Sequence, residues 1–230
     1  AVLDDDGDLL VAVADMRATD ELAVVDLAAL PGLLATSGAV VADANLDTEV
    51  VRWVVAAAAA AGVPVVLEPV SVAKATGLAA VLDDGQPVHT VTPNVDELAA
   101  LVGAHLADTV DDVVRAARRL HERGVEHVWV RRGTRGSLLS IRARVDVSRV
   151  VLVGAPPVEV ADVTGAGDSM TAGYVHALLD GADVVEAARY GQVLAALTCA
   201  SPDTVRADLT EALVTARLTA SHPPTEELVR

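Results

Sequence analysis

The residues best suited to chemistry lie in one stretch, Asp162–Gly173, which reads DVTGAGDSMTAG. Its small residues Gly165, Ala166 and Gly167 let backbone amides approach an anion, and a helix that follows them directs its positive dipole end to the same place. Asp168 adds a carboxylate that could take the proton of a hydroxyl group, or could serve only as a helix N-cap. Amide donors beside a general base are what phosphoryl transfer to an alcohol requires. The stretch therefore predicts a phosphotransferase.

The letters DVTGAGD resemble the C-terminal motif of the PfkB, or ribokinase-like, carbohydrate and nucleoside kinases. The resemblance implies that Asp168 is the general base and that the amides of Gly165, Ala166 and Gly167 form the anion hole. It assigns Thr164 to the nucleotide site. ATP and Mg²⁺ are the implied cofactors, with a monovalent cation such as K⁺ as a further candidate. A purely structural glycine-rich turn is the alternative.

Asn94 and Glu97 in TPNVDE resemble the NxxE motif of the same family. There the asparagine reaches phosphate oxygens and the glutamate organises Mg²⁺, often through water, which suits a hard cation. The alternative is an ordinary helix start, in which Glu97 only opposes the helix dipole. The resemblance therefore assigns Asn94 to the nucleotide and the metal, and Glu97 to the metal.

Gly133 and Gly136 in VRRGTRGSLL stand where the family has a TxGxxG-like sequence whose backbone lines the nucleotide; a plain hairpin turn is the alternative. Arg131 stands where a hydroxyl residue is usual. With Arg132 and Arg135 it either offsets phosphate charge or belongs to a solvated turn.

A late helix that carries Gln192, Ala196 and Cys199 would border the adenine in this family, although the same spacing suits core residues. Lys74, the one lysine of the chain, lies in EPVSVAK, which resembles the DPVSxxK stretch of the pseudouridine kinases. We assign Lys74 to the cofactor site, with chance retention on the surface as the alternative. Glu68 stands where that stretch has aspartate.

Two more stretches resemble the pseudouridine kinase subgroup and indicate the acceptor: VVADANLD, with Asp43 and Asn45, and VAVADM, with Asp15. They imply substrate-binding roles for these residues, together with Asp168, and pseudouridine as the small-molecule substrate. Another sugar or nucleoside is the first alternative, and a nucleotide-binding protein without catalysis is the second. An oxidoreductase that uses a dinucleotide would need its glycine motif in the first βαβ unit, whereas GAGD lies near the C-terminus.

The composition limits the partners. A formal net charge of −16 over 230 residues disfavours nucleic acid and anionic membranes. The chain has one cysteine, which excludes an internal disulfide. Without a bilayer-length apolar run or a signal-peptide pattern, a cytoplasmic protein is expected. The six histidines show no metal-ligand spacing, so we expect surface or core histidines.

Hydrophobic residues form 52% of the chain and aromatic residues 2%, which favours tightly layered strands and helices. Alternating patterns predict an α/β fold with parallel strands joined by helices. The family resemblance implies a three-layer αβα sandwich, ribokinase-like, with a mostly parallel central sheet and a small β lid remnant at the N-terminus. The expected strands are Ala39–Ala42, Val63–Leu67, Val88–Thr92, His127–Val130, Ser137–Ile141, Arg149–Val153 and Val158–Val163. The expected helices are Asp20–Leu34, Thr48–Ala61, Asp96–Val102, Thr109–Arg123, Ser169–Leu179, Val184–Thr198 and Ala207–Ala220, and a helix or turn is expected around Val72–Leu82.

One kinase domain is expected: a lid hairpin remnant over 1–16 with arms around Asp4–Gly7, an α/β core over 17–220, and an irregular polar tail over 221–230. Members of the family carry a further N-terminal segment that supplies sheet strands and part of the sugar site. The sequence therefore suggests a fragment or a natural truncation. An exposed sheet edge would then favour association, for example into a homodimer.

Overall fold

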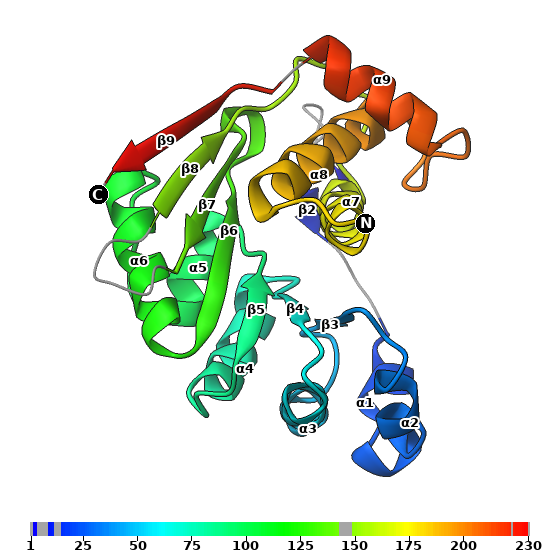
Figure 1. Cartoon of the computed structure of the whole chain (residues 1–230), viewed down its shortest axis with the longest axis vertical. Coiled ribbons are helices and arrows are strands. Elements are labelled where there is room, and N and C mark those ends of the chain that lie inside the picture. The colour runs from blue at the N-terminus through cyan, green and yellow to red at the C-terminus, as the bar shows by residue number, and fades with distance from the viewer. Residues whose placement is uncertain (1, 4–8, 12–14, 143–148, 222, 230) are drawn as a thin grey trace.

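A computed structural model describes residues 2–3, 9–11, 15–142, 149–221 and 223–229. Its centre is a sheet of seven strands in chain order, from β3 to β9 (Figure 1). The first three strand pairs are parallel and the last three antiparallel, so β3, β4, β5, β6 and β8 share one direction. The expected, mostly parallel sheet is confirmed. The strands are β3 (Val40–Asp43), β4 (Val65–Glu68), β5 (Val88–Val91), β6 (Val125–Arg131), β7 (Ser137–Ile141), β8 (Arg149–Val153) and β9 (Thr225–Val229).

Helices cover both faces of this sheet, which confirms the three-layer sandwich (Figure 1). One face is covered by α3 (Thr48–Ala61), α4 (Val72–Leu82), α5 (Val95–Val102) and α6 (Val110–Glu122). The other is covered by α7 (Ala166–Leu179) and α8 (Val184–Cys199), and α9 (Glu211–Ser221) packs on α8. The remaining helical elements are α1 (Arg17–Asp20), α2 (Leu30–Leu34) and the 3-10 turns η1 (Val24–Leu27) and η2 (Gly133–Arg135).

The side chains of β6 show why the sheet has helices on both sides. Val128 and Val130 enter the core under α3–α6, while Trp129 between them enters the core under α7 and α8. Successive strand residues point to opposite faces, so the apolar run Val128–Val130 needs a cover on each side of the sheet. The Trp129 ring lies 4.8 Å, centre to centre, from the ring of Tyr174 on α7.

Two expected elements were wrong. Val158–Val163 forms no strand, because Pro156 and Pro157 interrupt the chain after β8 and the Ala161 amide donates to the Cys199 carbonyl at 2.8 Å instead of joining the sheet. The helix expected over Asp20–Leu34 is broken into α1, η1 and α2.

Both ends of the chain differ in part from expectation. The tail expected to be irregular contains β9, which pairs along the whole of β8. At the N-terminus β1 (Val2–Leu3) and β2 (Leu9–Val11) pair antiparallel as a hairpin requires, while its turn at Asp4–Gly7 lies outside the described residues. The lid role of this hairpin stays a prediction. No helix in the described part of the chain is both long and apolar enough to cross a bilayer.

Candidate active site

A cleft of about 970 Å³ opens where the parallel strands end. Carboxyl ends of neighbouring parallel strands meet at one edge of a sheet, and ligands of such folds bind there. The chain segments that follow β3, β4, β5 and β6 reach this edge, and the first turn of α7 and one side of α8 complete the walls. Most residues predicted from sequence line the cleft together: Asp43, Asn45, Asn94, Glu97, Arg131, Gly133, Gly136, Gly165, Ala166, Gly167, Asp168 and Gln192.

The turn before α7 is held by its own backbone. Asp162 accepts the Thr164 amide at 2.8 Å, and this bond lowers the pKa of the exposed Asp162 carboxyl. Gly165 then caps the helix at φ +78°, where a Cβ atom would lie 2.7 Å from the Thr204 carbonyl oxygen. A side chain is therefore excluded both by the left-handed backbone and by the neighbouring chain. As a result α7 begins at Ala166, three residues earlier than expected.

Unused donors and one free carboxylate meet at this turn. The Ala166 amide donates to Val163, but no described residue accepts from the amides of Gly165, Gly167 or Asp168. Asp168 is the third residue of α7 and is exposed, and no described group donates to its carboxylate. It is therefore not the N-cap. The first amides of a helix favour an anion, and here they stand next to a carboxylate that has no structural partner.

Arg131 lies on the cleft floor between two carboxylates. It donates to Glu68 at 2.6 and 3.1 Å and to Glu97 at 3.1 Å, and its side chain is 17% exposed. The interpretation as a solvated turn residue is therefore wrong for Arg131. A Cβ atom at Gly167 would lie 2.5 Å from Arg131 Nη1, so the guanidinium also reaches the turn before α7. Positive charge is thus fixed beside the unused amides.

Glu68 is the most densely bonded carboxylate of the cleft. Besides Arg131 it accepts from the hydroxyls of Thr92, at 2.6 Å, and Thr171, at 3.3 Å. The Val70 amide adds a contact of 3.3 Å, made from a backbone with φ +68°. A β-branched residue rarely adopts this conformation, and such outliers gather at functional sites. Sequence reasoning did not assign a role to Val70, which lines the cleft.

Asn94 and Glu97 form a reciprocal helix cap at the start of α5. Asn94 Oδ1 accepts the Glu97 amide and Glu97 Oε2 accepts the Asn94 amide, both at 2.8 Å. The ordinary helix-start alternative is thus confirmed as a structural role. Both residues also line the cleft, and no described group donates to Glu97 Oε1. The Asn94 amide NH₂ and Glu97 Oε1 remain for a ligand.

Gly133 and Gly136 enclose the short turn between β6 and β7. Both have positive φ, +57° and +77°, and a Cβ atom at Gly136 would collide with the Val153 carbonyl. Arg132 and Arg135 point elsewhere, since both pair with Asp108. The glycines line the cleft with their backbone, whereas these two arginines do not line it.

One side of α8 carries Gln192, Ala195, Ala196 and Cys199 into the cleft. Gln192 is buried, and its Oε1 finds no hydrogen-bond donor among the described residues. Buried acceptors are normally bonded, so this atom awaits a ligand donor or water. Burial, followed by the charge of Asp162, raises the pKa of the Cys199 thiol, which keeps the thiol neutral.

Asp43 and Asn45 follow β3 and bond to each other. The amide and the side-chain NH₂ of Asn45 donate to the two Asp43 oxygens, both at 2.9 Å. Three other predicted residues do not line the cleft. Lys74 lies in the first turn of α4, Thr164 is exposed in the turn before α7, and Asp15 is exposed and pairs with Arg17.

The chain after β8 contributes a wall that sequence reasoning missed. Ala155, Pro156, Pro157, Val158 and Val160 all line the cleft, and the last two lie in the stretch Val158–Val163 that was interpreted as a strand. The Pro156-Pro157 pair was the available signal, because proline cannot join a central ladder and favours an extended, unpaired segment. Thr134 and Met170 were also missed.

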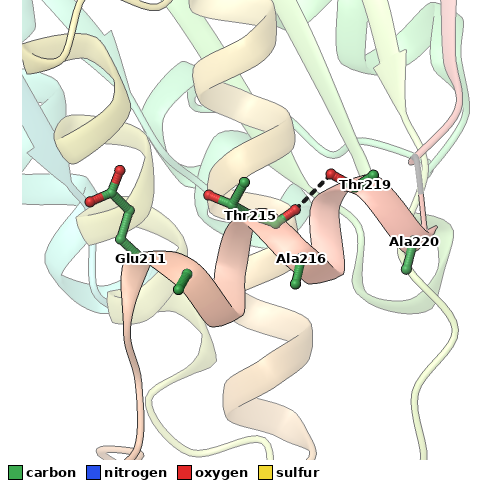
Figure 2. A pocket seen from close by; sticks show the side chains of 6 residues that line it. Glu211, Thr215, Ala216, Thr219 and Ala220 are labelled. Carbon is green, nitrogen blue, oxygen red and sulfur yellow. Dashed lines mark hydrogen bonds between the residues drawn. The ribbon is translucent and has the colours of Figure 1, made fainter.

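A second hollow, of about 670 Å³, runs along α9 and is lined by one helix alone (Figure 2). Glu211, Thr215 and Thr219 supply its polar groups, and the Thr219 hydroxyl bonds the Thr215 carbonyl at 2.9 Å, as the dashed line in Figure 2 shows. In the described part of the chain its lining comes from α9 alone, without converging polar groups from other elements, so the cleft at the strand ends remains the candidate site.

Known proteins share this architecture. The pseudouridine kinase of Escherichia coli strain K12 is 31% identical over 215 residues, which cover 93% of this chain and 65% of that enzyme. A carbohydrate kinase from Agrobacterium tumefaciens matches with a TM-score of 0.75 and 30% identity, over 99% of this chain and 69% of that one. The Arabidopsis thaliana ribokinase solved with ribose and ATP matches with a TM-score of 0.66 and 25% identity, over 83% and 59%.

This chain thus spans about two thirds of the length of the Escherichia coli pseudouridine kinase. A family model described as pfkB family carbohydrate kinase matches residues 8–211, which include both the NxxE and the GAGD motifs. On this match, the chain belongs to the pfkB family of carbohydrate kinases.

Proposed function

We propose that this chain is the phosphoryl-transfer domain of a kinase that uses ATP to phosphorylate a hydroxyl group of a sugar or nucleoside. One observation supports the proposal most directly. The Asp168 carboxylate, which has no donor among the described residues, stands beside the unused amides of Gly165 and Gly167 in a cleft of about 970 Å³. A base and an anion site at one helix start are the parts that phosphoryl transfer needs.

The cleft residues fit a nucleotide. The backbone at Gly133 and Gly136 lies on one side, and nothing stands within 4 Å of a Cβ position at Gly133, which leaves room for a ligand. Gln192 Oε1 offers a buried acceptor to an amino or hydroxyl group. The free amides of Gly165 and Gly167 would hold the phosphate end.

The cleft also suits Mg²⁺, which prefers oxygen ligands and keeps part of its water. Glu97 Oε1 is a cleft carboxylate oxygen with no donor among the described residues, and Asn94 lies beside Glu97. A bound Mg²⁺ would neutralise phosphate charge. Arg131 already neutralises the buried carboxylates around it, so the floor of the cleft does not repel the phosphates.

Asp168 acts as the general base in this proposal. It takes the proton from the acceptor hydroxyl, the hydroxyl oxygen forms a bond to the γ-phosphorus, and the bond from that phosphorus to the bridging oxygen breaks to release ADP. The amides of Gly165 and Gly167 stabilise the charge that develops on the phosphoryl oxygens.

The proposed acceptor is pseudouridine, phosphorylated at its 5′-hydroxyl. The supporting residues are Asp43 and Asn45, which line the β3 side of the cleft and offer oxygen atoms to sugar hydroxyls. They belong to stretches that resemble the pseudouridine kinases, and the Escherichia coli relative carries that name.

The test measures ADP release from Mg-ATP with pseudouridine, uridine, ribose and adenosine as separate acceptors. We expect turnover with pseudouridine and a loss of at least roughly 100-fold in Asp168→Asn, which keeps the shape and removes the base. Asp180→Asn is the matched control, because Asp180 is exposed at the other end of α7.

Near-normal turnover in Asp168→Asn would contradict the catalytic assignment. Turnover with another acceptor alone would retain the kinase and change its substrate. ATP binding that is indifferent to Asp168→Asn, without turnover on any acceptor, would support a nucleotide-binding protein that does not catalyse.

A further inference from the structure

A second group of polar side chains lies at the amino ends of β5 and β6, away from the cleft at their carboxyl ends. It consists of His89, Glu126 and His127. One ligand-forming atom from each of the three lies within 4.8 Å of the other two. The two imidazole rings meet edge to face, with centres 4.8 Å apart and an interplanar angle of 73°.

Strand pairing brings the three residues to one place. Strands β5 and β6 are parallel and pair Val88 with Val125, Thr90 with His127 and Val91 with Val128. His89 on β5 therefore lies beside Glu126–His127 on β6.

Within the described part of the chain, one ring nitrogen of His127 lacks the partner that a core histidine normally has. His127 Nδ1 is buried and has no hydrogen-bond partner among the described residues, whereas His121 nearby uses both ring nitrogens. A buried polar atom without a partner calls for an explanation such as an absent ion. The Nδ1 atom of His127 therefore lacks a hydrogen-bond partner or ligand in the chain as described.

His89 has the outer contact that metal-binding histidines show. Its Nδ1 lies 2.8 Å from the Thr90 hydroxyl, which lies 2.9 Å from the Tyr174 hydroxyl on α7. When Thr90 accepts from Nδ1, the lone pair of His89 Nε2 is left for a ligand. Burial lowers the pKa of both imidazoles, that of His127 to about 4, so both rings are neutral near pH 7.

We propose that His89, His127 and Glu126 bind one divalent transition-metal ion of the Zn²⁺ class, with water completing its coordination. Two imidazoles and one carboxylate are a donor set typical of Zn²⁺, and Glu126 is exposed and free to close on the ion. The ion would join β5 to β6. The imidazoles distinguish this site from the cleft, whose oxygen donors suit Mg²⁺.

The test titrates the metal-free chain with Zn²⁺ by calorimetry and with Co²⁺ by visible absorption. We expect one equivalent to bind and to raise the melting temperature, since an ion that binds the native state stabilises it. His89→Ala and His127→Ala should each weaken Zn²⁺ binding by at least roughly 100-fold. The loss of an outer-shell partner costs up to about 100-fold, and the loss of a direct ligand should cost no less. His105→Ala, an exposed histidine after α5, should bind as the unaltered chain does.

Glu126→Gln decides the matter if a histidine variant does not fold, because its side chain is exposed and its loss leaves the core intact. It should weaken Zn²⁺ binding without changing the melting temperature of the metal-free protein. The proposal is overturned if neither ion binds saturably, or if Glu126→Gln and the folded histidine variants bind Zn²⁺ as tightly as the unaltered chain. The metal titrations and melting temperatures are measured without nucleotide, so their outcome is independent of the proposed kinase activity.

Discussion

The guanidinium of Arg131 donates to both carboxylate oxygens of Glu68, from Nη1 at 3.1 Å and from Nη2 at 2.6 Å. Each residue departs from a pattern that the sequence resembles: Arg131 stands where the TxGxxG-like sequence has a hydroxyl residue, and Glu68 where the pseudouridine kinase stretch DPVSxxK has aspartate. The structure shows that the two departures contact each other across 63 positions of sequence. The additional methylene of glutamate and the long arginine side chain thus form one buried pair at the cleft floor.

Breaking this pair should be costly, because it leaves a buried charge without its partner. We expect Arg131→Met to lower the free energy of unfolding by about 3 kcal/mol in urea denaturation. The double variant Glu68→Gln with Arg131→Met should lose at least roughly 1 kcal/mol less than the sum of the single variants, because the residues interact directly. Strict additivity would show that the pair is not coupled. Arg52→Met, which breaks the more exposed pair with Asp84, should cost under about 1 kcal/mol.

Val70 should be replaceable with a gain in stability. Its φ of +68° stores strain of about 1–3 kcal/mol, and asparagine tolerates this conformation without the entropy cost of glycine. Val70→Asn should therefore raise the free energy of unfolding by about 1 kcal/mol. Val72→Asn, in an exposed position at the start of α4, should change it by less than about 0.5 kcal/mol. Destabilisation by Val70→Asn would mean that the contacts of the valine side chain outweigh the strain.

Gly191 should tolerate no side chain, because α7 and α8 approach each other closely there. A Cβ atom at Gly191 would collide with the Met170 carbonyl and lie 2.7 Å from Trp129 Cη2. We expect Gly191→Ala to lower the melting temperature and to cost about 2 kcal/mol, despite the better helix propensity of alanine. Gly32→Ala in α2, where nothing lies within 4 Å, should stabilise by about 0.5–1 kcal/mol. Equal effects of the two replacements would contradict this account.

Local signals in the sequence were sufficient for several elements. Thr48–Ala61 and Ser137–Ile141 were predicted to the residue. The helix has an Asp47 side chain that accepts the Glu49 amide and a left-handed Gly62 at its end, so its limits are encoded by its own residues. The local structure of GAGD and NxxE is also encoded within each motif. In GAGD the unused donors are backbone amides at a helix start. In NxxE the first and last residues cap each other within four positions.

What the sequence did not reveal depends on contacts between distant segments. The Arg131–Glu68 pair joins β6 to β4, and the cluster of His89 with Glu126–His127 joins β5 to β6. The spacing of residues within one segment of the sequence cannot predict such contacts between strands. The wall formed by Pro156 and its neighbours was missed because a valine-rich pattern fits a strand and an unpaired extended chain equally well.

His121 should make the protein less stable below pH 6.5. The ring is buried between the Val125 carbonyl and the Ser140 hydroxyl, and its pKa is lowered by burial, with smaller contributions from the charges of Arg142 and Arg118. His121 therefore takes up a proton near pH 6.5 in the unfolded chain, but only at a lower pH in the folded chain. The stability that neutral His121 provides is complete above pH 6.5 and is lost as the pH falls below it.

The measurement compares urea unfolding at pH 7.5 and 5.5. One pH unit below the unfolded pKa costs at most about 1.4 kcal/mol per group. His121→Gln, which can bond both partners and cannot titrate, should therefore lose less stability on acidification than the unaltered chain. The exposed His105→Gln is the control and should follow the unaltered chain. His89, whose pKa is also lowered, titrates in all three proteins and cancels in the comparison. Burial is the main cause that lowers the pKa of His127, and His121→Gln removes only the smaller contribution of the His121 charge. An identical loss in His121→Gln and the unaltered chain would assign the acid sensitivity to other groups.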